Sequence, residues 1–113
     1  MTTLYHNPRC SKSREALNLL QEKGETLEIV KYLEHPPTHQ ELKQVIELLG
    51  IEPIDLVRTK ESIWKENYKG KELTDEEVIN AMVENPKLIE RPIAIRGTRA
   101  IIGRPPEKVL QIL

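Results

Sequence analysis

The first 33 residues alternate between strand-type and helix-type patterns, and this alternation limits the possible folds more than any other feature. A short strand is predicted at residues 3–5, a helix at 11–23 and a second strand at 26–33. Gly24 directly follows the helical pattern and is a typical stop signal. A strand, a helix and a strand in this order form a parallel pair joined by a right-handed crossover. The chain is therefore expected to contain a parallel strand pair covered by a helix.

Two capping boxes predict helices in the middle of the chain, because a threonine followed three residues later by a glutamate satisfies two free backbone N–H groups. The boxes are Thr38 with Glu41 and Thr74 with Glu77. Between the two helices, residues 53–57 favour a short helix. Residues 60–77 are rich in charge, so we expect a solvated face there, with Trp64 partly exposed.

The last 23 residues predict a hairpin followed by a helix. Apolar segments at 93–95 and 100–102 flank Arg96-Gly97-Thr98, and Pro105-Pro106 suits a first helical turn. With the parallel pair, this gives an α/β fold: a thioredoxin-like mixed four-stranded sheet flanked by helices, with a helical insertion after the second strand. A chain of 113 residues fits one compact domain, so a single domain over 1–113 is predicted.

Composition argues against several classes of partner. The net charge is −1, so no overall field favours nucleic acid. No apolar run approaches the roughly 20 residues of a membrane span, and the N-terminal residues do not resemble a signal peptide. One cysteine and three scattered histidines provide no metal-ligand cluster, and the single cysteine excludes an internal disulfide. We expect a cytoplasmic protein that binds no metal, nucleic acid or membrane.

The only cysteine, Cys10, lies in HNPRCSKSR, between the first predicted strand and the first helix. The start of a helix and nearby cations both lower a thiol pKa, which favours the nucleophilic thiolate. The cationic or titratable neighbours are His6, Arg9, Lys12 and Arg14. Ser11 and Ser13 add hydroxyl donors. The alternative is that Cys10 is a small buried apolar residue beside solvated charges.

Spacing excludes two other uses of a cysteine. A low-molecular-weight phosphatase loop needs an arginine six residues after the cysteine, where this chain has Ala16. A dithiol redox motif needs a second cysteine where this chain has Ser13. If Cys10 reacts, an outside thiol must complete the reaction.

HNPRCSKSR matches the His-Asn-Pro-x-Cys-x-x-Ser-Arg signature, and the chain therefore resembles the glutaredoxin-coupled arsenate reductase family. The resemblance continues through YLEHPPT (32–38), ENPKLIERPI (84–93) and GRPPE (103–107), and it covers essentially the whole chain. It implies a thioredoxin-like fold, binding of arsenate or a similar oxyanion, and reduction of arsenate to arsenite. Glutathione would be the co-substrate and glutaredoxin the protein partner, with no bound cofactor, and we expect a monomer.

The resemblance also implies roles for particular residues. Cys10 would attack arsenate, His6 would lower the pKa of the thiol, and Pro92 would follow a cis peptide bond. Substrate-binding candidates are Arg58, Arg91, Arg104, Ser11, Ser13 and Arg14. Lys60 competes with Arg58 for its position in the motif. His6 has an alternative role as a structural hydrogen-bonding residue.

Two other functions stay open at this point. The first is a glutathione-linked thiol reductase with a different substrate, which would need the same reactive cysteine. The second is a non-enzymatic regulator that binds RNA polymerase, a branch of this fold that senses stress through a Cys-x-x-Cys switch. Ser13 takes the place of the second cysteine and argues against the regulator.

Overall fold

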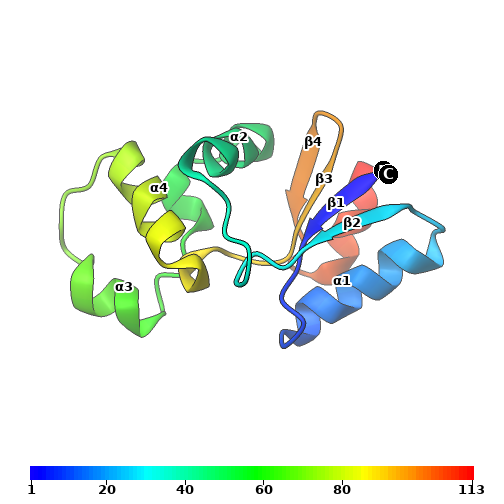
Figure 1. Cartoon of the computed structure of the whole chain (residues 1–113), viewed down its shortest axis with the longest axis horizontal. Coiled ribbons are helices and arrows are strands. Elements are labelled where there is room, and N and C mark those ends of the chain that lie inside the picture. Colours follow the sequence, from blue (N-terminus) through cyan, green and yellow to red (C-terminus); the bar gives the residue numbers. More distant parts are fainter. The chain divides into compact units, whose positions relative to one another are not determined.

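The computed structural model describes all 113 residues and divides them into two compact units (Figure 1). The first unit consists of Met1–His35 and Arg91–Leu113, and the second of Pro36–Glu90. The second unit is thus inserted into the first between its second and third strands. The prediction that residues 1–113 form a single domain stays a prediction.

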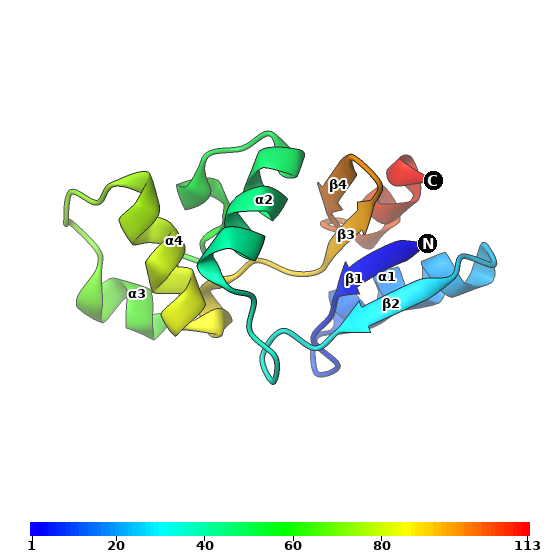
Figure 2. The same cartoon turned by 45° about the horizontal axis from the view of Figure 1, so that its top comes forward.

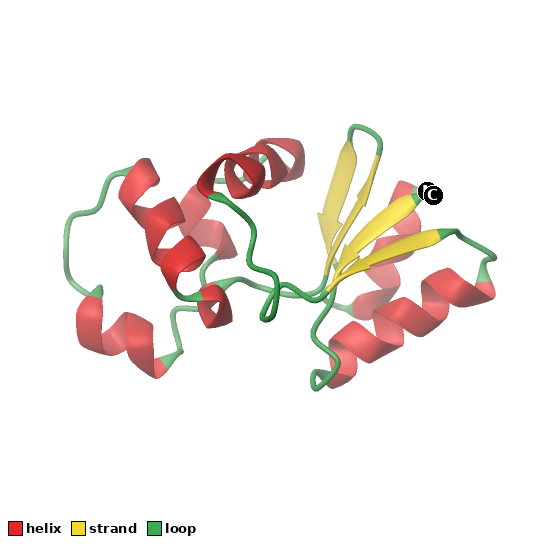
Figure 3. Cartoon of the chain, in the orientation of Figure 1, coloured by secondary structure: helices red, strands yellow, loops and turns green.

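The first unit contains one four-stranded sheet (Figure 3). Its strands are β1 (Thr2–Tyr5), β2 (Leu27–Val30), β3 (Ile93–Arg96) and β4 (Arg99–Ile102), in the spatial order β2-β1-β3-β4. β1 pairs in parallel with β2 and antiparallel with β3, and β3 pairs antiparallel with β4. The predicted mixed sheet, with its opening parallel pair and closing hairpin, is confirmed.

Two helices lie on the same side of this sheet, α1 (Ser11–Glu22) and the 3-10 helix η3 (Pro106–Ile112) (Figure 1). Leu4 and Ala94 are opposite each other on β1 and β3 and face them. The fully or nearly fully buried core consists of Leu4, Ala16, Leu20, Ala94, Val109 and Ile112. This packing fixes the start of α1 beside the end of β1, where the loop 6–10 connects them.

The second unit is helical (Figure 2). Its helices are α2 (His39–Leu49), η1 (Pro53–Leu56), α3 (Ser62–Asn67), α4 (Asp75–Glu84) and η2 (Pro86–Leu88). Both predicted capping boxes are present, since the hydroxyl groups of Thr38 and Thr74 accept the N–H groups of Glu41 and Glu77. None of the helices in the chain combines the length and the apolar character that crossing a bilayer requires.

Two local predictions need correction. Trp64 is only 7% exposed and stacks on Tyr68 with 5.2 Å between ring centroids, so α3 is anchored inward although its sequence is charged. β2 is shorter than predicted, because the chain leaves the sheet after Val30. The predicted last helix is present at Pro106–Ile112, and it has 3-10 geometry.

Candidate active site

Cys10 is the residue directly before α1, and its side chain is 9% exposed. Its backbone is extended, with φ −92° and ψ 122°, and its carbonyl accepts the N–H of Arg14 at 3.0 Å. The thiol therefore lies at the end of α1 where backbone N–H groups have no partner within the helix. Such groups stabilise negative charge, so this position favours a thiolate.

The loop before Cys10 is held by hydrogen bonds within itself and to α1. The Cys10 N–H donates to the carbonyl of Asn7 at 3.0 Å, and the Arg9 N–H donates to Asn7 Oδ1 at 3.0 Å. Arg14 Nη1 donates to the carbonyl of Pro8 at 3.0 Å. Asn7 and Arg14 therefore fix the course of the loop, and with it the position of the thiol.

Ser13 connects this loop to His6. Its hydroxyl is fully buried, accepts the N–H of Asn7 at 3.0 Å and lies 2.6 Å from His6 Nδ1. Burial lowers the pKa of His6, and the nearby charges of Lys31 and Arg14 lower it further. His6 is thus mainly neutral at pH 7, and the tautomer of its ring decides whether Nδ1 donates to the Ser13 hydroxyl or accepts from it. These contacts fit the structural role that we considered for His6.

The pKa of the Cys10 thiol results from opposing influences. Burial raises this pKa, but the N–H of Ser13, the Arg91 guanidinium and the N–H of Lys12 together lower it below its ordinary value. The helix start supplies the two backbone donors, and Arg91 supplies a hydrogen bond and a positive charge. The arrangement makes Cys10 more nucleophilic at neutral pH than an ordinary thiol.

Two arginines from distant parts of the sequence meet at this thiol. Arg104 Nη2 donates to Cys10 Sγ at 3.8 Å, and Arg104 Nε donates to the carbonyl of Arg91 at 2.9 Å. The side chain of Arg91 also hydrogen-bonds the thiol, and its Nε and Nη1 atoms are buried. The structure thus brings together three of the residues singled out in the sequence: Cys10, Arg91 and Arg104.

The backbone around these arginines is closely packed. The Arg91–Pro92 peptide bond is cis, as predicted, and so is Arg104–Pro105. The Gly103 N–H donates to the carbonyl of Pro92 at 2.9 Å. A Cβ at Gly103 would lie 2.8 Å from Pro92 Cγ and 2.8 Å from Val109 Cγ1, closer than carbon atoms pack. Only glycine fits here, directly before Arg104.

The third predicted arginine, Arg58, belongs to the helical unit. Arg58 Nη1 donates to Glu61 Oε1 at 2.7 Å, and its Nε lies 3.9 Å from Glu90 Oε1. Its own N–H donates to the carbonyl of Leu88 at 2.7 Å. Lys60, which competes with Arg58 in the motif, is exposed. The role of Arg58 toward a substrate stays a prediction.

The remaining candidates in the loop differ in exposure. Ser11 is exposed, whereas Ser13 is fully buried and already bound to His6 and Asn7. Lys12 is exposed, with its ammonium group 4.0 Å from Glu15 Oε2. No group of three or more His, Cys, Asp or Glu residues gathers where it could hold a metal ion.

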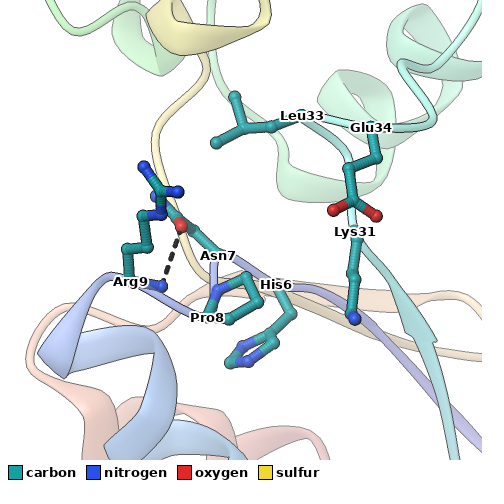
Figure 4. Close-up of a pocket in the computed structure, with 7 residues that line it drawn as sticks. All are labelled: His6, Asn7, Pro8, Arg9, Lys31, Leu33 and Glu34. Atoms are coloured by element: carbon teal, nitrogen blue, oxygen red, sulfur yellow. Dashed lines mark hydrogen bonds between the residues drawn. The ribbon is translucent and has the colours of Figure 1, made fainter.

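A pocket with a volume of about 400 Å³ opens beside the loop (Figure 4). Its lining residues are His6, Asn7, Pro8, Arg9, Lys31, Leu33 and Glu34. The sequence reasoning did not single out Lys31 or Glu34, nor Asn7 and Gly103. Asn7 and Gly103 are part of the signature stretches HNPRCSKSR and GRPPE, so the motifs themselves were the available signal for these two.

The comparison with protein families agrees with this geometry. The model of the ArsC family matches residues 5–112. The chain belongs to the ArsC family. An "Uncharacterized protein YfgD" of Escherichia coli is 51% identical, with 97% of this chain and 94% of that protein covered. A protein of Haemophilus influenzae named "Arsenate reductase" is 46% identical, with 97% of each chain covered.

A solved structure described as an arsenate reductase from Vibrio cholerae is also similar. It is 47% identical to this chain, with a TM-score of 0.96, and the match covers 99% of this chain and 97% of the other. Membership of the ArsC family and the α/β fold with its mixed four-stranded sheet are therefore established together.

Proposed function

We propose that this protein reduces arsenate to arsenite through Cys10, with glutathione and glutaredoxin as the external thiol system. The observation that carries the proposal is the contact of both Arg91 and Arg104 with a thiol whose pKa is lowered. Arginine forks suit a tetrahedral oxyanion, and a thiolate is the form that attacks it. Relatives of the ArsC family that carry the name arsenate reductase support the same substrate.

The reaction begins when the Cys10 sulfur forms a bond to arsenic and one oxygen leaves, after protonation, as water. Arg91 and Arg104 hold the remaining oxygens and offset their negative charge. The thiol of glutathione then attacks the adduct. The two sulfurs each give one electron to arsenic, which leaves as arsenite, and together they form a mixed disulfide. Glutaredoxin and a second glutathione reduce this disulfide and restore the Cys10 thiol.

The external thiols are part of the proposal because the chain contains one cysteine. Arg58 is the third proposed oxyanion ligand, and this role rests on its place in the family motif. Ser11 is exposed close to the thiol and can add a hydroxyl donor to a bound oxyanion. Ser13 and Arg14 act through the loop, since their polar groups already bind His6, Asn7 and Pro8.

The direct test is arsenate-dependent NADPH consumption in the presence of glutathione, glutaredoxin and glutathione reductase. Cys10→Ser should abolish the rate, and Arg91→Lys and Arg104→Lys should each lower it about tenfold or more, because a point charge replaces a planar fork. Arg99→Lys is the matched control, since Arg99 Nη2 binds the carbonyl of Gln111 instead. A wild-type rate that does not rise with arsenate would refute the proposal.

A second measurement separates arsenate reduction from a thiol reductase with another substrate. Arsenate should slow the alkylation of Cys10 by iodoacetamide, because the bound oxyanion occupies the space in front of the sulfur. The same protection should be lost in Arg104→Lys. Alkylation at an unchanged rate in saturating arsenate would favour the thiol reductase.

A further inference from the structure

The pocket beside the loop is built from two segments of the first unit. His6, Asn7, Pro8 and Arg9 come from the loop that ends at Cys10, and Lys31, Leu33 and Glu34 follow β2. Figure 4 shows Arg9 on one side of the pocket and Lys31 with Glu34 on the other. Its volume of about 400 Å³ lies in the range of small-molecule sites. The pocket therefore has the size of a small-molecule site, and one of its walls is the loop that ends at Cys10.

The charged side chains that line this pocket form no ion pairs within the protein. None of the ion pairs in the chain involves Arg9, Lys31 or Glu34. Another hollow, in the helical unit, differs in this respect, because its Lys43 and Glu76 already pair at 3.0 Å. The pocket beside Cys10 thus offers two cations and one anion that a ligand can bind.

The signs of these charges indicate which class of ligand is complementary to the pocket. Arsenate has only negative charge, and the carboxylate of Glu34 would repel it. Glutathione carries two carboxylates and one ammonium group at neutral pH. These match the two cations and the one anion of the pocket, and the exposed Leu33 can cover the apolar part of the peptide.

We propose that this pocket binds the thiol co-substrate, a peptide thiol of the glutathione class, with its carboxylates at Arg9 and Lys31 and its ammonium group at Glu34. The proposal rests on the proposed function for the identity of the co-substrate. In this proposal the oxyanion and the peptide thiol bind at different places. The arginines at the sulfur bind the oxyanion, and the pocket binds the peptide. Each can then bind while the other is present.

The test uses S-methylglutathione, a thioether that cannot react with Cys10. Titration into the wild-type protein should shift the backbone amide NMR signals of His6, Asn7, Arg9 and residues 31–34 in a saturable way. Lys31→Glu and Glu34→Lys should each weaken this binding about tenfold or more. Lys23→Glu and Glu22→Lys make the same charge changes at exposed positions outside the pocket and should leave binding unchanged.

A second ligand tests the orientation. The N-acetylated analogue of S-methylglutathione lacks the ammonium group, so it should bind more weakly to the wild type. Its affinity should rise, rather than fall, in Glu34→Lys, because the substitution replaces repulsion of the carboxylates by attraction. Equal weakening of both ligands in Glu34→Lys would overturn the proposed orientation.

The outcomes separate this proposal from the proposed function. Saturable binding at the pocket with no arsenate-dependent turnover would support the pocket and refute the function. Turnover that depends on glutathione, with the same KM for glutathione in Lys31→Glu as in wild type, would refute the pocket and leave the function standing. Absence of saturable binding of S-methylglutathione would also overturn the pocket.

Discussion

Two opposing influences act on the Cys10 thiol at the residue scale. Burial favours the neutral thiol, whereas the donors at the start of α1 and the Arg91 guanidinium favour the thiolate, and the thiolate side prevails. The cations next to Cys10 in sequence stabilise the thiolate less than their number indicates, because the side chains of Arg9 and Lys12 are exposed to solvent, which screens their charge. The nucleophile is therefore prepared by groups from two separate segments of the chain, the start of α1 and the segment that begins at Arg91.

Removal of the Arg91 charge should make Cys10 less reactive at neutral pH. A lowered pKa means that the thiolate, and with it the alkylation rate, appears at lower pH than in an ordinary thiol. Arg91→Gln should raise the pKa and shift the pH–rate midpoint for iodoacetamide upward, toward the midpoint of the urea-unfolded chain. Lys12→Gln removes a charge close by in sequence and is the control. Equal shifts of the midpoint in the two variants would show that the pKa of Cys10 responds to the net charge of the region and not to Arg91 in particular.

Loss of the Ser13 hydroxyl should destabilise the folded protein. Ser13→Ala leaves His6 Nδ1 and the Asn7 N–H without their partner, and an unsatisfied buried group costs about 1–3 kcal/mol. The free energy of unfolding in urea should fall by this amount. Ser11→Ala removes an exposed hydroxyl from the same first turn of α1 and should change the free energy of unfolding by less than about 0.5 kcal/mol. Similar values for the two variants would contradict a structural role for Ser13.

At the scale of elements, sequence rules that involve neighbouring residues correctly predicted the features that depend on contacts between neighbouring residues. Both capping boxes form, because each joins residues three apart in sequence. The face of α1 with Ala16 and Leu20 is buried, because helical spacing puts these residues on one side. α3 was missed because its burial depends on one residue, Trp64, among charged neighbours. Such a helix has too few apolar positions to produce a periodic signal.

The connection between β4 and η3 depends on Gly103. In Gly103→Ala the added Cβ would lie 2.8 Å from atoms of both Pro92 and Val109, so the backbone must shift. Overpacking of this kind costs about 1–3 kcal/mol, and the free energy of unfolding should fall accordingly. Val109→Ala removes one of the two clashing side chains. Its combination with Gly103→Ala should therefore cost less than the sum of the single changes, and strict additivity would argue against the clash.

At the scale of the whole molecule, the order of elements was enough to predict the mixed sheet and its helical insertion. It could not predict which arginines reach the thiol, because those contacts join residues 81 and 94 positions apart in sequence. Only the family motif indicated Arg91 and Arg104, and both lie at the sulfur. The pocket with Lys31 and Glu34 had no comparable signal, since exposed charges after a strand are common.

Oxyanion binding should stabilise the whole molecule without any turnover. A ligand that binds only the native state adds about 2.7 kcal/mol to the free energy of unfolding when its concentration is 100 times its Kd. Arsenate should therefore raise the Tm of Cys10→Ser, which binds the oxyanion but cannot react with it. The rise should be lost in the double variants with Arg91→Gln or Arg104→Gln and kept with Arg99→Gln. Calorimetry at constant ionic strength measures these Tm values.

Arg58→Gln tests the third arginine in the same way, because an undiminished rise would remove Arg58 from the proposed site. A rise of equal size in all variants would mean that arsenate acts as a general salt, and the arginines would lose their proposed role.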